Sequence, residues 1–216
     1  MVDQKKLAQF WDKDVPEKFK HFSGSDFDPK VEKCRADIKR HFVDQIDFTD
    51  VRVMLDWGCG GGIGSLLLSE YSNVIALDIA ESSLESANKY MREHGKAFAN
   101  TYKLDDIETL TIKENVDLLF SASVVQHFPS LDYWRKVAAY WKSLEPKWIA
   151  VQTRHGEQNK SNEKDYFDTE KNYILGLYLT TEEVTGWFDD CYELKYHELI
   201  DDNYTMYEYF VFKRQQ

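Results

Sequence analysis

Short apolar or β-branched runs alternate with amphipathic stretches along the middle of the chain. An apolar run of four to eight residues predicts a buried strand, and apolar residues that recur every three or four positions predict a helix. The predicted strands are 51–56, 74–78, 99–104, 116–122 and 148–153. Strands that alternate with helices form parallel βαβ units, so the pattern predicts an α/β fold.

Three amphipathic stretches supply the helices between these strands. The first covers 63–71. The second opens with Ser-Ser-Leu-Glu at 82–85, which has the spacing of a capping box, and it ends at Gly95. The third follows Ser130 and is expected to pack on the core through one apolar face. That face consists of Trp134, Val137, Ala138, Trp141 and Leu144.

The N-terminal end of the chain departs from this rhythm. It is rich in aromatic and charged residues, and it forms a predicted helical cap over 1–46. A helix over 31–43 is expected inside this cap, because apolar residues there recur at helical spacing. They are Cys34, Ile38, Phe42 and Ile46.

The C-terminal end also differs from the middle of the chain. The polar stretch 156–171 predicts a surface loop that acts as a lid or insertion. Thr180 then opens a short helix with a second capping pattern. Two alternating runs, 192–200 and 204–213, are joined by Asp-Asp-Asn and predict a β-hairpin.

Length and composition favour one domain. The 216 residues, of which 43% are hydrophobic, suffice for one sizeable α/β core. We expect a single domain over 1–216, with the cap at 1–46, a core at 47–153, and a loop, helix and hairpin at 154–216.

Charge and cysteine usage narrow the class of protein. The formal net charge of −11 repels polyphosphate, so a nucleic-acid partner is disfavoured. No apolar stretch approaches the ~20 residues that a membrane helix needs, and the first six residues lack the apolar core of a secretion signal. Three widely spaced cysteines predict neither a disulfide framework nor a metal site. We expect a cytoplasmic protein with no membrane partner.

A glycine-rich loop follows the first predicted strand. Five glycines occupy the seven positions from Gly58 to Gly64, directly after a strand that ends in Asp56. Each glycine gives up side-chain packing, so the backbone there is expected to approach a ligand closely. A loop between a parallel strand and a helix N-terminus exposes backbone N–H groups, which suit a carboxylate or another anion.

Two classes of nucleoside ligand use such a loop. The dinucleotide pattern G-x-G-x-x-G fails here, because its third glycine would fall on Ile63, Ser65 or Leu67. What is present is an acid followed by G-x-G-x-G, starting at Gly58. This motif resembles the first motif of the class I S-adenosylmethionine-dependent methyltransferases. The resemblance implies that Asp56 and the loop residues Gly58, Cys59 and Gly60 hold the amino-acid end of S-adenosylmethionine.

The resemblance extends in order over 51–153 and assigns further positions. Asp78, at the end of the second strand, is expected to accept hydrogen bonds from the ribose diol, as it would in either ligand class. The family places the next residue, Ile79, against the adenine. It also implies an adenine contact at Asp106, with Asp105 the next choice. The remaining cofactor contacts that it implies are Ile107, Ser121 and Trp11.

The family also implies a fold. It is a three-layer sandwich around a mostly parallel seven-stranded sheet whose last strand is antiparallel. The N-terminal helical region would cap this sandwich. The resemblance explains neither that N-terminal region nor the stretch 156–179.

Catalysis of methyl transfer needs little beyond alignment, because the sulfonium is already activated. If the acceptor is a hydroxyl, a base adds to the rate, and histidine is the usual residue. His127 follows the fourth strand, where the family binds its acceptor, and is the candidate base. The alternative is that His127 braces the helix or touches the cofactor. His155, beside Arg154 after the fifth strand, is the competing candidate.

The acceptor is expected to be a small molecule. Motifs of three other methyltransferase subclasses are absent: an Asp/Asn-Pro-Pro-aromatic tetrad after Phe120, a cysteine nucleophile for base-carbon methylation, and clustered acids for a metal past the fourth strand. Trp11 and Phe19 are expected on one side of the acceptor pocket. The other side is assigned to Arg154, His155, Tyr166, Tyr173 and Tyr178. A sugar, a phenol, or a carboxylated or phosphorylated metabolite would suit these residues.

We expect methylation of oxygen rather than nitrogen. The alternatives are methylation of nitrogen in a small molecule, or methylation of a protein or tRNA. A Rossmann-type NAD oxidoreductase and a cofactor-binding module without catalysis are the rivals from other classes.

Overall fold

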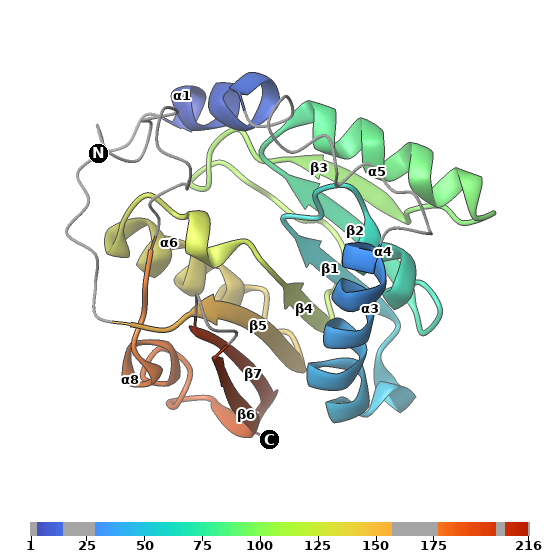
Figure 1. The fold of residues 1–216 in the computed structure, drawn as a ribbon. Helices are drawn as coiled ribbons and strands as arrows, with labels where there is room; N and C mark the ends of the chain where they lie inside the picture. The colour runs from blue at the N-terminus through green and yellow to red at the C-terminus, as the bar shows by residue number, and fades with distance from the viewer. Residues whose placement is uncertain (1–3, 15–28, 157–176, 202–205, 216) are drawn as a thin grey trace.

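The computed structural model describes residues 4–14, 29–156, 177–201 and 206–215. Seven strands form one sheet in the order β3-β2-β1-β4-β5-β7-β6 (Figure 1). They are β1 (Val53–Trp57), β2 (Asn73–Asp78), β3 (Asn100–Lys103), β4 (Leu118–Ser121), β5 (Trp148–Arg154), β6 (Tyr192–Asp201) and β7 (Met206–Arg214). The predicted lid, Phe19, Tyr166 and Tyr173 lie outside the described residues.

The strand directions confirm the predicted fold class. The first five strands are parallel, and β7 runs antiparallel to both β5 and β6. Parallel strands direct their carboxyl ends to one edge of the sheet, which is where ligands bind in open α/β folds. The predicted hairpin therefore inserts its second strand beside β5, while β6 forms the outer edge.

Helices cover both faces of the sheet. They are α1 (Gln4–Gln9), α3 (Pro29–His41), α4 (Ile63–Leu68), α5 (Glu81–Glu93), α6 (Leu131–Ser143) and α8 (Thr181–Thr185). Single turns occur at η1 (Phe10–Asp14), η3 (Val43–Gln45), η4 (Phe48–Asp50) and η5 (Val125–His127). The α6 and α8 helices pack on one face, and α3, α4 and α5 lie on the other (Figure 1).

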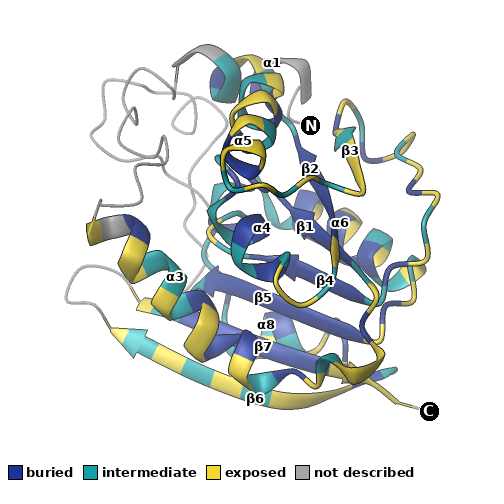
Figure 2. Ribbon diagram, turned by 90° about the vertical axis from the view of Figure 1, so that its right-hand side faces the viewer, coloured by how far each residue is buried: buried dark blue, intermediate teal, exposed yellow. Residues whose placement is uncertain are grey.

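The core consists of the two faces of the central strands. Strands β1, β4, β5 and β7 are mostly buried, whereas β6 alternates between exposed and half-buried residues (Figure 2). The predicted stripe on α6 is confirmed as core, because Trp134, Val137, Ala138 and Trp141 are fully buried. Leu144 packs against the same cluster as a partly buried residue.

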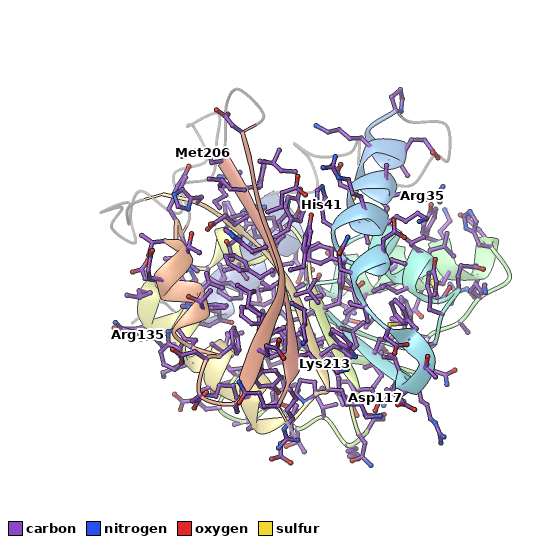
Figure 3. All side chains as sticks on the ribbon, turned by 90° about the horizontal axis from the view of Figure 1, so that it is seen from below. Arg35, His41, Asp117, Arg135, Met206 and Lys213 are labelled. Atoms are coloured by element: carbon purple, nitrogen blue, oxygen red, sulfur yellow. The ribbon has the colours of Figure 1, made fainter. Side chains whose placement is uncertain are left out.

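Helix α3 links the N-terminal region to the terminal hairpin. Figure 3 shows His41 on the side of α3 that faces β6 and β7, with Arg35 on the other side. The His41 ring stacks on Tyr209 of β7 at a centroid distance of 4.1 Å. The Arg40 guanidinium forms a 2.9 Å ion pair with Glu198 of β6.

Two predicted helix starts have different outcomes. The capping box at Thr180 is confirmed, with reciprocal side-chain bonds to and from Glu183. The capping box at 82–85 is wrong, because α5 begins at Glu81 after Ala80, which has no capping side chain. A distant residue takes that role: Asp12 accepts bonds from the backbone N–H and the hydroxyl of Ser82, each at 3.0 Å.

Some element bounds also differ from the prediction. Helix α4 ends at Leu68 rather than at 71, and β3 is limited to Asn100–Lys103. In the described part of the chain, no helix is both long and apolar enough to cross a lipid bilayer.

Candidate active site

The glycine loop joins β1 to α4 at the carboxyl edge of the sheet. The backbone N–H groups of Gly58 and Cys59 both donate to Leu77 O, at 2.7 and 3.0 Å, which fixes the loop against β2. Gly58 has φ +78°, and a Cβ there would lie 2.4 Å from a methyl carbon of Val124. Gly60 has φ +51° with open space where its Cβ would be. Gly58 is thus required by packing and by conformation, whereas Gly60 leaves room for a ligand.

Asp56 lies beneath this loop as a buried carboxyl group. Only 3% of the residue is exposed, and its Oδ2 accepts a 2.5 Å hydrogen bond from the Ser65 hydroxyl. Burial raises the pKa of Asp56 to about 7, and the Ser65 bond opposes that shift. Asp78 adds to the shift as a neighbouring acid. A positively charged ligand group beside Asp56 would stabilise its ionised form.

Asp78 lies at the end of β2, as predicted, and holds the loop in place. Its two oxygens accept backbone N–H bonds from Gly60 and Ala80, both at 2.9 Å. Burial raises its pKa, although these bonds favour the charged form. Ile79 follows as a partly buried residue packed on the core. Each carboxylate oxygen has a second lone pair, so the ribose contact predicted for Asp78 is compatible with these bonds.

The two acids assigned to the adenine, Asp105 and Asp106, lie in the loop after β3 and differ in their exposure and in their partners. Asp105 is exposed and forms a 3.3 Å ion pair with Lys103. Asp106 is half-buried, and its Oδ1 accepts the Glu108 N–H at 2.9 Å. Ile107, the residue after Asp106, is buried in the core. These two acids line a shallow depression with Tyr102, Thr109 and Leu110, so the preference for Asp106 stays a prediction.

Cys59 and Ser121 are buried, Cys59 in the glycine loop and Ser121 at the end of β4. Burial raises the pKa of the Cys59 thiol well above its ordinary value, which keeps it protonated. The Ser121 hydroxyl donates to Trp57 O at 3.1 Å and so joins the ends of β4 and β1. Their predicted cofactor contacts remain untested.

His127 ends η5, the short turn after β4, and lies beside η1 of the N-terminal region. Its ring meets Trp11 edge-on at a centroid distance of 4.8 Å. Burial lowers the pKa of His127 to about 3, and the positive charge of Arg154 adds to this effect. The imidazole is therefore neutral near pH 7. The structure thus brings Trp11 against His127 and places Arg154 close enough for its charge to act on the imidazole, while the roles predicted for these residues remain untested.

A polar network that the sequence analysis missed connects β4, β5 and β7. Ser123 has φ +60°, a strained conformation for a residue with a side chain. Both its N–H and its hydroxyl donate to Gln152 Oε1, at 2.8 and 2.9 Å. The amide nitrogen of Gln152 donates to the Tyr209 hydroxyl at 3.0 Å. Gln152, the first polar residue after the apolar run that opens β5, was the one signal in the sequence.

His155 lies on the other side of the sheet from this network. Its Nδ1 is 3.0 Å from Oε2 of Glu208, a fully buried acid. The other oxygen of Glu208 accepts the Thr181 hydroxyl at 2.5 Å and lies 2.9 Å from His197 Nε2. His155 is thus engaged away from His127, and its predicted acceptor contact remains untested. Tyr178 lies near Arg154, whose Cζ is 5.9 Å from the ring centroid.

These residues fit the predicted cofactor. The described residues leave open space where a Cβ of Gly60 would be, and the buried acids Asp56 and Asp78 suit an ammonium group and a ribose diol. In the part of the chain that the structure describes, no group of three or more His, Cys, Asp or Glu side chains is arranged to hold a metal ion.

Comparisons with known proteins agree with this fit. A family model described as a methyltransferase domain matches residues 54–147. The ubiquinone biosynthesis O-methyltransferase of Rickettsia canadensis is 26% identical over 193 residues, which is 86% of this chain and 72% of that protein. The protein of the same name from Rickettsia conorii is 28% identical over 62% of this chain, and the match covers 41% of that protein.

Solved structures share the fold at low identity. The magnesium protoporphyrin IX methyltransferase of Synechocystis, with bound S-adenosylmethionine, superposes with a TM-score of 0.73 at 13% identity over 100% of this chain and 98% of that one. The N-methyltransferase NodS of Bradyrhizobium japonicum gives 0.66 at 12% identity over 93% and 98%. Together with the family match and the curated relatives, these results show that the chain is an S-adenosylmethionine-dependent methyltransferase.

Proposed function

We propose that this enzyme transfers a methyl group to a hydroxyl oxygen of a small-molecule acceptor. The observation that carries the proposal is the alignment of 86% of this chain with a protein named as an O-methyltransferase. The net charge of −11 gives further support, because it disfavours tRNA as the acceptor.

The glycine loop and the acids beside it would hold the cofactor. We assign the amino-acid end to Asp56, Gly58, Cys59 and Gly60, and the ribose diol to Asp78. The adenine and the remaining surface would contact Ile79, Asp106, Ile107, Ser121 and Trp11, with Asp105 next to Asp106. The bound cofactor supplies an activated methyl group on a positively charged sulfur.

His127 is proposed as the proton acceptor for the hydroxyl. A pKa of about 3 makes its imidazole a weak base, so it would not ionise a free hydroxyl beforehand. The hydroxyl group becomes far more acidic as its oxygen forms a bond to the methyl carbon, because the oxygen then gains positive charge. A neutral imidazole close to that oxygen can then take the proton as the new C–O bond forms.

The product identifies the methylated atom and the acceptor class. The enzyme would be incubated with S-adenosylmethionine labelled with ¹³C in the methyl group and with a deproteinised metabolite extract. We expect the label in the low-mass fraction, with the carbon chemical shift of an O-methyl group. An N-methyl shift, or label in protein or tRNA added in a parallel incubation, would contradict the proposal.

The His127→Ala variant tests the proposed base. We expect turnover to fall by about 10²-fold, while the affinity for S-adenosylhomocysteine changes by less than about threefold. Single-turnover rates and calorimetry measure the two quantities. Weakened cofactor binding with unchanged turnover would show that His127 is structural.

A further inference from the structure

Arg154 is a cation with no partner in the described part of the chain. It ends β5 and is half-buried, and its Nε is buried without a hydrogen bond. The Arg154 guanidinium lies over the ring of Tyr178, with 5.9 Å between Cζ and the ring centroid. Burying a charge without an opposite charge or hydrogen bonds costs free energy, so this arrangement needs a reason.

Acidic side chains pair with other arginines in the described residues. Arg35, Arg40, Arg135 and Arg214 each form an ion pair with a glutamate or an aspartate, at 2.6 to 3.3 Å. The chain has 38 acidic and 27 basic residues, so acids are not scarce. No ion pair is found for Arg52 and Arg92 among the described residues either, but both side chains are exposed to water, whereas Arg154 is half-buried.

The neighbouring strand offers Arg154 no carboxylate. Tyr207 lies opposite it in the β5–β7 register. The next residue along β7, Glu208, is engaged with Thr181, His197 and His155. Side chains of successive strand residues point to opposite faces, so His155 and Arg154 diverge.

Arg154 also lies close to the proposed reaction centre. Its charge is felt at His127, which follows β4, the strand beside β5. The N–H of Leu177 donates to Gln126 O at 3.0 Å, and the N–H of Leu179 donates to Arg154 O at 2.9 Å. These bonds join the segment 177–179 to both η5 and the end of β5, so the backbone of Tyr178 bridges the two elements.

We propose that Arg154 binds an anionic group of the methyl acceptor, a carboxylate or a phosphate. The inference rests on the proposed function and names its substrate class. A guanidinium matches both anions through parallel N–H bonds. The Tyr178 ring, 5.9 Å from Cζ, leaves these N–H groups without a carboxylate partner. Acceptors of the same shape without the anion are expected to bind poorly.

Binding of an anionic acceptor would then make His127, the proposed base, easier to protonate. The positive charge of Arg154 is one of two causes that lower the pKa of His127. An anion on Arg154 offsets that charge, so His127 takes up a proton more readily when the correct acceptor is present. Recognition and proton transfer are thereby coupled through one residue.

Thermal denaturation of Arg154→Met tests whether the chain itself pairs with this cation. In a low-salt buffer without multivalent anions, we expect the melting temperature to stay equal to that of the wild type or to rise by about 2–4 °C. Arg214→Met is the matched control, because it loses an ion pair with Glu145 and is expected to melt lower. A melting temperature of Arg154→Met below that of the wild type overturns the proposal.

Ligand binding tests the anion directly. The full chain, saturated with S-adenosylhomocysteine, would be titrated with benzoate, phenyl phosphate and the neutral benzamide. We expect benzoate or phenyl phosphate to raise the melting temperature of the wild type, and benzamide to leave it unchanged. The anion-dependent shift should be lost in Arg154→Met and kept in Arg214→Met. The two anions separate a carboxylate site from a phosphate site.

Two results would overturn the inference. One is an equal shift with benzoate and benzamide, and the other is no shift with either anion. If S-adenosylhomocysteine binds and the anions do not, the proposal for Arg154 fails while the proposed function stands. If the labelled methyl group is found on nitrogen or on a macromolecule, the proposed function fails independently of these titrations.

Discussion

At the scale of single residues, two buried acids lie on adjacent strands. Asp56 and Asp78 end β1 and β2, and burial raises the pKa of both carboxyl groups. Hydrogen bonds from Ser65, Gly60 and Ala80 only partly offset that cost. Such groups lower stability in the free protein and are useful when a ligand brings a positive charge or hydroxyl donors.

The pH dependence of stability follows from Asp56. Its pKa rises from 3.8 to about 7 on folding, so between those values the folded protein holds a proton that the unfolded chain has lost. This contribution is present at low pH and is lost as the pH rises towards 7. We expect Asp56→Asn to gain about 2 kcal/mol of unfolding free energy over the wild type between pH 5 and pH 8.

Urea denaturation of both proteins at the two pH values measures this difference. Asp132→Asn is the control, because the Asp132 side chain is exposed and pairs with Arg135 on the surface. Its difference from the wild type should be the same at pH 5 and pH 8. Parallel behaviour of Asp56→Asn and Asp132→Asn would contradict the raised pKa.

Asp78 should govern cofactor affinity. Both of its oxygens accept a backbone N–H, so an amide in its place must lose one of these bonds as well as the charge. We expect Asp78→Asn to weaken the binding of S-adenosylhomocysteine by more than about tenfold in calorimetry, since charge-assisted bonds are lost. Asp132→Asn serves again as the control. Unchanged affinity in Asp78→Asn would contradict the assignment of Asp78 to the ribose diol.

At the scale of elements, η1 in the N-terminal region is tied to the start of α5 by hydrogen bonds. Helix α5 has no cap of its own, and Asp12 supplies one through Ser82 from about 70 positions away. Trp11, the adjacent residue, contacts His127. The bond that caps α5 therefore also fixes a side chain over the proposed reaction centre.

Loss of this cap has a measurable cost. We expect Asp12→Ala to lower the unfolding free energy by about 1 kcal/mol, as for the loss of an N-cap side chain. Glu93→Ala, at the other end of the same helix, is the matched control and should be neutral or slightly stabilising, because it removes an acid near the negative end of the dipole. Equal losses in the two variants would argue against a capping role.

The same elements show what the sequence could predict. Five parallel strands and the hairpin followed from apolar periodicity, and Asp56, the glycines and Asp78 followed from short spacings within one βαβ unit. The Asp12–Ser82 cap, the Ser123–Gln152–Tyr209 network and the acid Glu208 with its histidines were missed. Each joins residues that are distant in the chain, and a local pattern does not specify such contacts.

At the scale of the whole molecule, the cofactor should stabilise the fold by mass action. Only the folded chain assembles the loop from Gly58 to Gly64 over Asp56 and against β2. A ligand at 100 times its Kd adds about 2.7 kcal/mol. For a chain of 216 residues this corresponds to a rise in melting temperature of roughly 5–10 °C.

Melting temperatures measured with three ligands distinguish a methyltransferase cofactor site from a dinucleotide site. The ligands are S-adenosylhomocysteine, S-adenosylmethionine and NAD. We expect the two sulfur nucleosides to raise the melting temperature and NAD to leave it unchanged, because the third glycine of the dinucleotide pattern is replaced by Ile63. Asp78→Asn should need a higher concentration of either nucleoside for the same shift, whereas Asp132→Asn should follow the wild type. A shift with NAD alone would mean that this loop binds pyrophosphate, and it would overturn the cofactor assignment at every residue named for it.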